Sequence, residues 1–205
     1  MQSKKTQTIE KKVLSRVYGH KRGWTFTPGH FLDLGGRAAV GMALKSICDR
    51  GVIRRLAPGL YDYPETHPKM GVLSPTPEAI ALALAGRDNL RLQPSGAYAA
   101  NLLGLSEQVP ARVVFLTDGD DRRVRVGRQE IILKRTTPKN MATAGRTSGL
   151  VIQALRHLGK DHVDDAVIDR LAQRLEPDDR RQLVKDIRFA PAWIGAILRR
   201  LAERG

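Results

Sequence analysis

Turn-forming residues divide the first third of the chain into short elements, and their spacing constrains the fold more than any other feature. Gly19 and Gly51 each end an apolar pattern of helical spacing, and Pro58-Gly59 separates two strand-like runs. Thr27-Pro28 is an N-cap followed by a first-turn proline, which predicts a further short helix that ends at Gly35-Gly36. The expected elements are helices at 9–19, 27–34 and 37–50, an aromatic strand at 24–26, and strands at 52–57 and 60–63.

This order of elements is typical of a winged helix-turn-helix, in which the second helix of the pair lies in the DNA major groove. That helix would be the one over 37–50, with an apolar face made by Val40, Leu44 and Ile47. A rotation of about 100° per residue puts the opposite face in solvent. The outward positions are Ala38, Met42, Lys45 and Asp49, flanked by Gly41 and Ser46.

Several side chains are candidates for contact with double-stranded DNA. Arg37 lies in the first turn of the expected recognition helix, and the small residues Ala38 and Gly41 would let the backbone approach the groove closely. The remaining candidates are Met42 and Lys45 on the same helix, the arm lysines Lys4, Lys5, Lys11 and Lys12, and the wing arginines Arg54 and Arg55. Plainer interpretations are a solvated Arg37 and, for the wing arginines, charges that protect an edge strand from aggregation.

The charge distribution favours a polyanionic partner for the N-terminal region. The formal net charge of the chain is +14, of which residues 1–73 carry +8. A stretch rich in proline and turn formers then predicts a boundary between domains at 1–73 and 74–205. The chain has 1 cysteine, which excludes an internal disulfide framework. No apolar run reaches the roughly 20 residues of a membrane helix, and no secretory leader is recognisable, so we expect a cytoplasmic protein without a membrane partner.

The second region alternates between helical and strand-like patterns. A helix follows Thr76-Pro77, a strand is expected at 89–93 and a helix at 95–103, in which Ser95 is the possible N-cap. Three strand-like runs over 111–135 predict a β-meander, and apolar periodicity predicts helices from 147 to the C-terminus. The whole chain is therefore expected to be α+β, a winged helix-turn-helix followed by a mixed α/β domain with a helical end.

No motif of the second region predicts catalysis. Asp118, Asp120 and Asp121 could attract a divalent ion, but Asp-Gly is a common turn pair. Ser95 lacks the GxSxG context of a nucleophile. The glycines and hydroxyls of 143–149 suit either a phosphate or a capped helix start, and a P-loop ending is absent. We therefore expect no enzyme activity, no metal site and no cofactor.

The charge of the expected meander allows three interpretations. Its basic residues are Arg112, Arg122, Arg123, Arg125, Arg128, Lys134 and Arg135. The plainest interpretation is a solvated sheet face. The alternatives are additional contacts to the DNA backbone and a surface for an acidic protein partner.

Five segments resemble a bacterial family related to the AbiEi antitoxins of type IV toxin–antitoxin systems. They lie at 35–64 (GGRAAVGMALKSICDRGVIRRLAPGLYDYP), 92–110 (LQPSGAYAANLLGLSEQVP), 116–127, 140–165 and 189–193. The resemblance implies an N-terminal winged helix that represses its own promoter and a second domain that antagonises a co-encoded toxin. The toxin would be a nucleotidyltransferase or a phosphoribosyltransferase-like protein. The implied DNA contacts are Arg37, Ala38, Gly41, Met42, Lys45, Arg54 and Arg55.

Together, these patterns predict a DNA-binding transcriptional regulator that acts as an antitoxin. One alternative is an antitoxin that works through protein contacts alone, without sequence-specific DNA binding. Another is an RNA-binding factor. The sequence leaves the oligomeric state open.

Overall fold

The chain forms two compact units, Met1–Asn89 and Leu90–Gly205, which we describe separately. The computed structural model describes residues 8–86 and 90–204. The expected boundary at 73/74 thus lies before the observed one, because a helix at Pro77–Ala85 belongs to the first unit.

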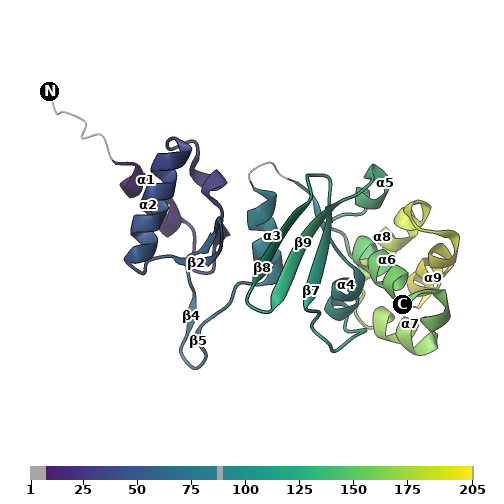
Figure 1. The fold of residues 1–205 in the computed structure, drawn as a ribbon. Coiled ribbons are helices and arrows are strands. Elements are labelled where there is room, and N and C mark those ends of the chain that lie inside the picture. The colour runs from purple at the N-terminus through teal and green to yellow at the C-terminus, as the bar shows by residue number, and fades with distance from the viewer. Residues whose placement is uncertain (1–7, 87–89, 205) are drawn as a thin grey trace. The chain divides into compact units, whose positions relative to one another are not determined.

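The first unit combines helices with a small antiparallel sheet (Figure 1). Its three-stranded sheet has the order β1-β3-β2. Its elements are α1 (Ile9–Gly19), β1 (Thr25–Phe26), a 3₁₀ turn η1 (Pro28–Phe31), α2 (Arg37–Asp49), β2 (Arg54–Ala57), β3 (Leu60–Asp62), β4 (Thr66–His67), β5 (Gly71–Val72) and α3 (Pro77–Ala85). The helix expected after Thr27-Pro28 is only this single 3₁₀ turn.

One apolar core holds these elements together. It contains Val13 and Val17 of α1, one side of α2, and the aromatic pair Phe26 and Phe31, whose ring centroids lie 5.3 Å apart. The chain passes close to α1 at Gly35, where an added Cβ would lie 2.5 Å from Cδ1 of Ile9. Glycine at this position therefore lets α1 and the turn before α2 pack together.

Two elements of the first unit differ from the sequence expectation. The stretch expected as a linker contains the hairpin of β4 and β5, closed at its base by a hydrogen bond from Leu73 N to Glu65 O (2.8 Å). The following helix α3 lies beside β1. It buries Ile80, Ala81, Ala83, Leu84 and Ala85, and this apolar surface explains why it stays with the first unit.

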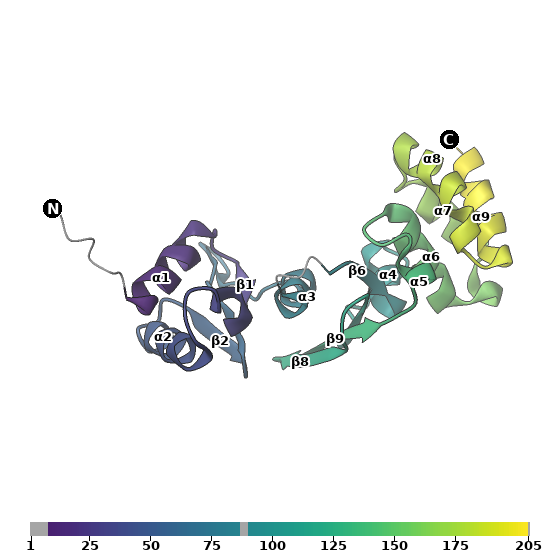
Figure 2. The same cartoon turned by 90° about the horizontal axis from the view of Figure 1, so that it is seen from above.

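The second unit contains a four-stranded sheet and a helical C-terminal part (Figures 1 and 2). Its strands are β6 (Leu92–Ser95), β7 (Arg112–Thr117), β8 (Arg122–Val126) and β9 (Gln129–Arg135). Its helices are α4 (Gly96–Leu102), α5 (Pro138–Met141), α6 (Thr147–Leu158), α7 (Asp165–Ala172), α8 (Pro177–Asp186) and α9 (Ala192–Glu203), with 3₁₀ turns at Lys160–His162 (η2) and Ile187–Phe189 (η3).

The predicted β-meander over 111–135 is wrong. The strand order is β6-β7-β9-β8, with β7 parallel to β9 and β8 at the edge. Val113 and Phe115 of β7 and Ile131 and Leu133 of β9 are buried, whereas the arginine-rich β8 is largely exposed. The two most apolar strands therefore pair at the centre, and the charged strand remains at the edge where its side chains stay hydrated.

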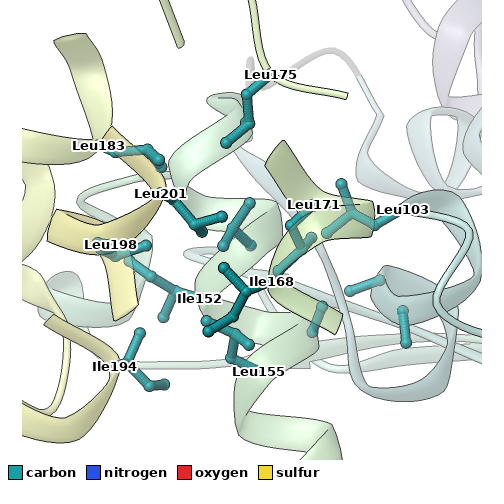
Figure 3. Close-up of a cluster of buried hydrophobic side chains, with 14 residues drawn as sticks. Leu103, Ile152, Leu155, Ile168, Leu171, Leu175, Leu183, Ile194, Leu198 and Leu201 are labelled. Carbon is teal, nitrogen blue, oxygen red and sulfur yellow. The ribbon is translucent and has the colours of Figure 1, made fainter. Parts of the chain in front are cut away.

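The helices of the second unit share a separate aliphatic core (Figure 3). Figure 3 shows side chains of α6, α7, α8 and α9 that converge on one cluster: Ile152 and Leu155 of α6, Ile168 and Leu171 of α7, Leu183 of α8, and Ile194, Leu198 and Leu201 of α9. The helical C-terminus expected from apolar periodicity is present.

The expected α+β class is confirmed, with helices and small sheets in both units. In the part of the chain that the structure describes, no helix is both long and apolar enough to cross a membrane.

Candidate nucleic-acid interface

Helix α2 has two chemically distinct faces. Val40, Ala43, Leu44 and Ile47 are buried in the first core. Of the outward positions expected from helical periodicity, Ala38, Met42, Lys45, Asp49 and the flanking Gly41 are exposed, whereas the flanking Ser46 is half-buried. Arg37 in the first turn is exposed as well. The side chain of Met42 is strongly exposed, at 68%. The structure therefore brings the five DNA-contact candidates of this helix together on one solvent-facing surface, which we call the α2 face: Arg37, Ala38, Gly41, Met42 and Lys45.

The N-terminal end of α2 leaves donors available to an anion. Its N-cap is Gly36, which has no side chain to accept from the first-turn N–H groups. Arg37 follows and is exposed, with no hydrogen bond or ion pair among the described residues. A helix N-terminus whose first N–H groups lack a side-chain cap suits a phosphate oxygen.

The C-terminal half of the α2 face carries an ion pair. Lys45 Nζ lies 2.8 Å from Asp49 Oδ2, and this hydrogen bond raises the pKa of Lys45. The two side chains are 77% and 62% exposed, respectively. Exposed pairs one helical turn apart contribute little stability, so Lys45 can exchange the carboxylate for another anion at small cost.

The two wing arginines have different environments. Arg54 donates from Nε and Nη2 to the two carboxylate oxygens of Asp62 (3.1 and 2.5 Å) and from Nη2 to Leu73 O (2.9 Å). The Asp62 side chain is only 3% exposed, and hydrogen bonding to it raises the pKa of Arg54. Arg54 thus balances a buried charge, and its contact with DNA stays a prediction. Arg55 is exposed and has no polar partner among the described residues.

Of the four arm lysines, two belong to the described residues, and both are on α1. Lys11 and Lys12 are exposed on α1, so the structure does not place them on the α2 face. Lys4 and Lys5 lie outside the described residues.

Two surface features of the first unit were missed by sequence reasoning. The β4–β5 hairpin exposes Met70 (74%) beside Lys69, and its only sequence signal is the pair of turn formers Pro68 and Gly71. An open cavity of about 600 Å³ lies along α1, β1 and α3. The ring of His20 stacks on Trp24 at its rim, with centroids 3.7 Å apart.

Three residues considered as candidates for catalysis or metal binding, Ser95, Asp118 and Asp121, form hydrogen bonds with other residues of the second unit. Ser95 was expected to cap the helix that it precedes. It is the N-cap residue of α4, but its side chain makes no capping bond and donates instead to Gln153 Oε1 (3.3 Å). Asp118 accepts from Arg91 N and Nε (3.0 and 2.9 Å), which lowers the pKa of its carboxyl. Asp121 accepts from Arg135 N (2.6 Å). No group of three or more metal-ligating side chains occurs within residues 8–86 and 90–204.

The segment 143–149, considered as a phosphate cradle, binds a carboxylate of the protein itself. Arg146 Nη1 and Ser148 Oγ donate to the two oxygens of buried Asp186 (2.8 and 2.5 Å), and Gln182 adds a third bond. Burial raises the pKa of Asp186, but these hydrogen bonds outweigh it and the pKa is lowered. Gly149 lies so close to Thr143 O that an added Cβ would be 2.3 Å away. This geometry favours a packed and anchored helix start.

The comparisons with known proteins give a family but no activity. A family model described as "Family of unknown function (DUF6088)" matches residues 11–183. No curated protein matches the chain.

Proposed function

The chain belongs to DUF6088, a family of unknown function, and from its own residues we propose that it is a sequence-specific DNA-binding transcriptional regulator. The first unit acts as a winged helix in this proposal, with α2 as the recognition helix. The observation that carries it is the α2 face, a solvent-exposed helical surface that combines an arginine, a lysine and small or flexible apolar residues.

The α2 face has the chemistry needed to read base edges. The major groove admits an α-helix, and residues near the N-terminus of that helix contact bases in helix-turn-helix proteins. Arg37 can donate two hydrogen bonds to guanine, while Ala38 and Met42 present methyl groups to thymine. Gly41 has no heavy atom of another residue within 4 Å of an added Cβ among the described residues, so its small size leaves room for the groove wall.

Contacts to phosphates supply affinity without choosing a sequence. Arg55 and the N-terminal end of α2 are the first anchors in this proposal, and Lys11 and Lys12 add charge on α1. The predicted arm lysines Lys4 and Lys5 remain part of the proposed set. Arg54 is not counted among these first anchors, because its guanidinium already pairs with Asp62.

Binding of the full chain to a labelled duplex from its own promoter tests the proposal. Fluorescence anisotropy should show preference for this duplex over a random duplex of equal length, with affinity that falls steeply as salt rises. A structured RNA of equal charge serves as competitor. Equal affinity for promoter and random duplex, or preference for the RNA, would contradict sequence-specific regulation of DNA.

We extend the proposal to an antitoxin function in the cytoplasm, which the resemblance to AbiEi-related proteins supports. The partner is then a co-encoded transferase toxin, and the chain represses their shared operon. Co-expression tests this extension separately from DNA binding. The chain should rescue cells from the neighbouring transferase, and an Arg37→Ala variant should still rescue when expressed from a foreign promoter.

A further inference from the structure

Strand β8 is an open edge of the sheet in the second unit. It is the last strand in the order β6-β7-β9-β8 and pairs only with β9 in the part of the chain that the structure describes. The β8–β9 hairpin lies on the side of this unit away from α7, α8 and α9 in both views (Figures 1 and 2). Such an edge can accept another extended chain through main-chain hydrogen bonds.

The register identifies the main-chain groups that face this edge. Val126 and Gln129 are paired across a two-residue turn in which Gly127 has φ +58°, so they exchange hydrogen bonds with each other. Bonded and non-bonded pairs alternate along an antiparallel ladder. The N–H and C=O groups of Arg123 and Arg125 therefore point away from β9, toward the open edge.

The same two residues make the edge strongly positive. Arg123 and Arg125 share a sheet face with Arg112 and Glu130. Glu130 forms ion pairs with two of these cations: its two carboxylate oxygens lie 3.0 Å from Arg112 Nε and 3.6 Å from Arg123 Nε. Arg125 is exposed and has no ion pair among the described residues. One carboxylate thus faces three guanidinium groups.

This charge pattern indicates which kind of molecule can bind at the β8 edge. Antiparallel pairing of two β8 strands about Val124 would place Arg123 opposite Arg125, and like charges in opposite positions destabilise a sheet. A second copy of the chain is therefore disfavoured. Single-stranded nucleic acid fits poorly as well, because the strand neighbours of the arginines on this face are the half-buried Val114 and Ile132, with no aromatic ring for base stacking. Duplex DNA is tested below as the competing occupant.

We propose that β8 binds an extended acidic segment of another protein, which adds a fifth strand to the sheet. Its acidic side chains lie beside Arg123 and Arg125, and its alternate apolar side chains lie beside the half-buried Val124 and Val126 on the other face. The partner segment is accordingly a short run in which Glu or Asp alternates with Val or Ile. This site is independent of DNA binding by the first unit.

Synthetic octapeptides test the proposal with the full chain. The probe is a fluorescein-labelled peptide of four Glu-Val repeats. The controls are an isomer with four Glu followed by four Val, and a Glu-Val peptide with N-methylated amides, which cannot pair as a strand. Anisotropy should show at least tenfold tighter binding of the alternating peptide than of either control. Amide NMR signals of Arg123 and Arg125 should shift on binding.

Charge-reversal variants then test whether the peptide binds at β8. The double variant Arg123→Glu/Arg125→Glu should lose the Glu-Val peptide and bind a Lys-Val peptide instead. The matched control Arg170→Glu/Arg199→Glu has the same net charge, changes two exposed arginines of the same unit, and should bind as the wild type does. Equal binding of the N-methylated peptide, or no change of preference in the β8 variant, would overturn the proposal. So would a β8 variant that loses duplex DNA but keeps the peptide.

Discussion

Replacing Arg54 with alanine removes the guanidinium that covers the buried carboxylate of Asp62. Three hydrogen bonds disappear, two to Asp62 and one to Leu73 O. Removing one partner of a fully buried ion pair costs about 3–5 kcal/mol, because the other charge is left without compensation. The Arg54 side chain is 36% exposed, so water can reach the abandoned carboxylate and the cost falls to about 2 kcal/mol.

Urea unfolding followed by Trp24 fluorescence measures this loss in the first unit. The second tryptophan, Trp193, lies in the other unit and is replaced by phenylalanine in all variants. For a unit of this size, about 2 kcal/mol corresponds to a fall in Tm of roughly 8–16 °C. Adding Asp62→Asn to Arg54→Ala should recover part of the loss, because no unpaired charge then remains.

Arg55→Ala is the matched control for this experiment. Arg55 is the next residue along β2 and lacks a partner among the described residues, so its loss should leave the urea midpoint unchanged. It should weaken binding to all duplexes and lower the salt slope by about 1. The structural assignment of Arg54 would be refuted if Arg54→Ala behaved in this second way, with an unchanged midpoint and uniformly weaker DNA binding.

Three further perturbations test the fold and the charge network. Leu44→Ala, which removes a fully buried side chain of α2, should cost about 2–5 kcal/mol in urea unfolding of the first unit, and an unchanged midpoint would contradict the packing of α2. Gly149→Ala should destabilise the second unit by about 1–3 kcal/mol by calorimetry, because the new methyl meets main chain at Thr143, whereas Gly41→Ala, which is free of such contact, should not destabilise the first. Because folding lowers the pKa of Asp186, its ionised carboxylate stabilises the second unit at pH values above the ordinary pKa of an aspartate, and this stability should be lost as the pH falls through the lowered pKa. Acid unfolding followed by circular dichroism should therefore depend less on pH in Asp186→Asn than in the wild type.

The α2 face could be derived from the sequence because helical periodicity is a local property. The spacing of Val40, Leu44 and Ile47 determines which side chains are buried, and the exposed positions follow from the same rotation. The environment of Arg54 could not be derived in this way. A regular hairpin around Pro58-Gly59 would place Arg55 opposite Asp62, but an irregularity between Arg55 and Ala57 shifts the register and puts Arg54 there.

The remaining differences arise from contacts between residues distant in the sequence. Turn formers flank β8 on both sides, with Gly119 before it and Gly127 after it, yet β7 and β9 pair with each other because they carry the buried apolar side chains. The proline-rich stretch near residue 73 is a good turn signal but does not end the first unit. Burial of α3 beside β1 extends that unit to Asn89.

The ratio of affinities for promoter and random duplex, measured for the wild type and Arg37→Ala, tests the recognition function of α2 most directly. Loss of a base contact should cost about 1–3 kcal/mol on the promoter alone, so the ratio should fall by roughly 5- to 150-fold. Binding to the random duplex should change little by comparison. An unchanged ratio in Arg37→Ala would contradict the assignment of α2 as the recognition helix.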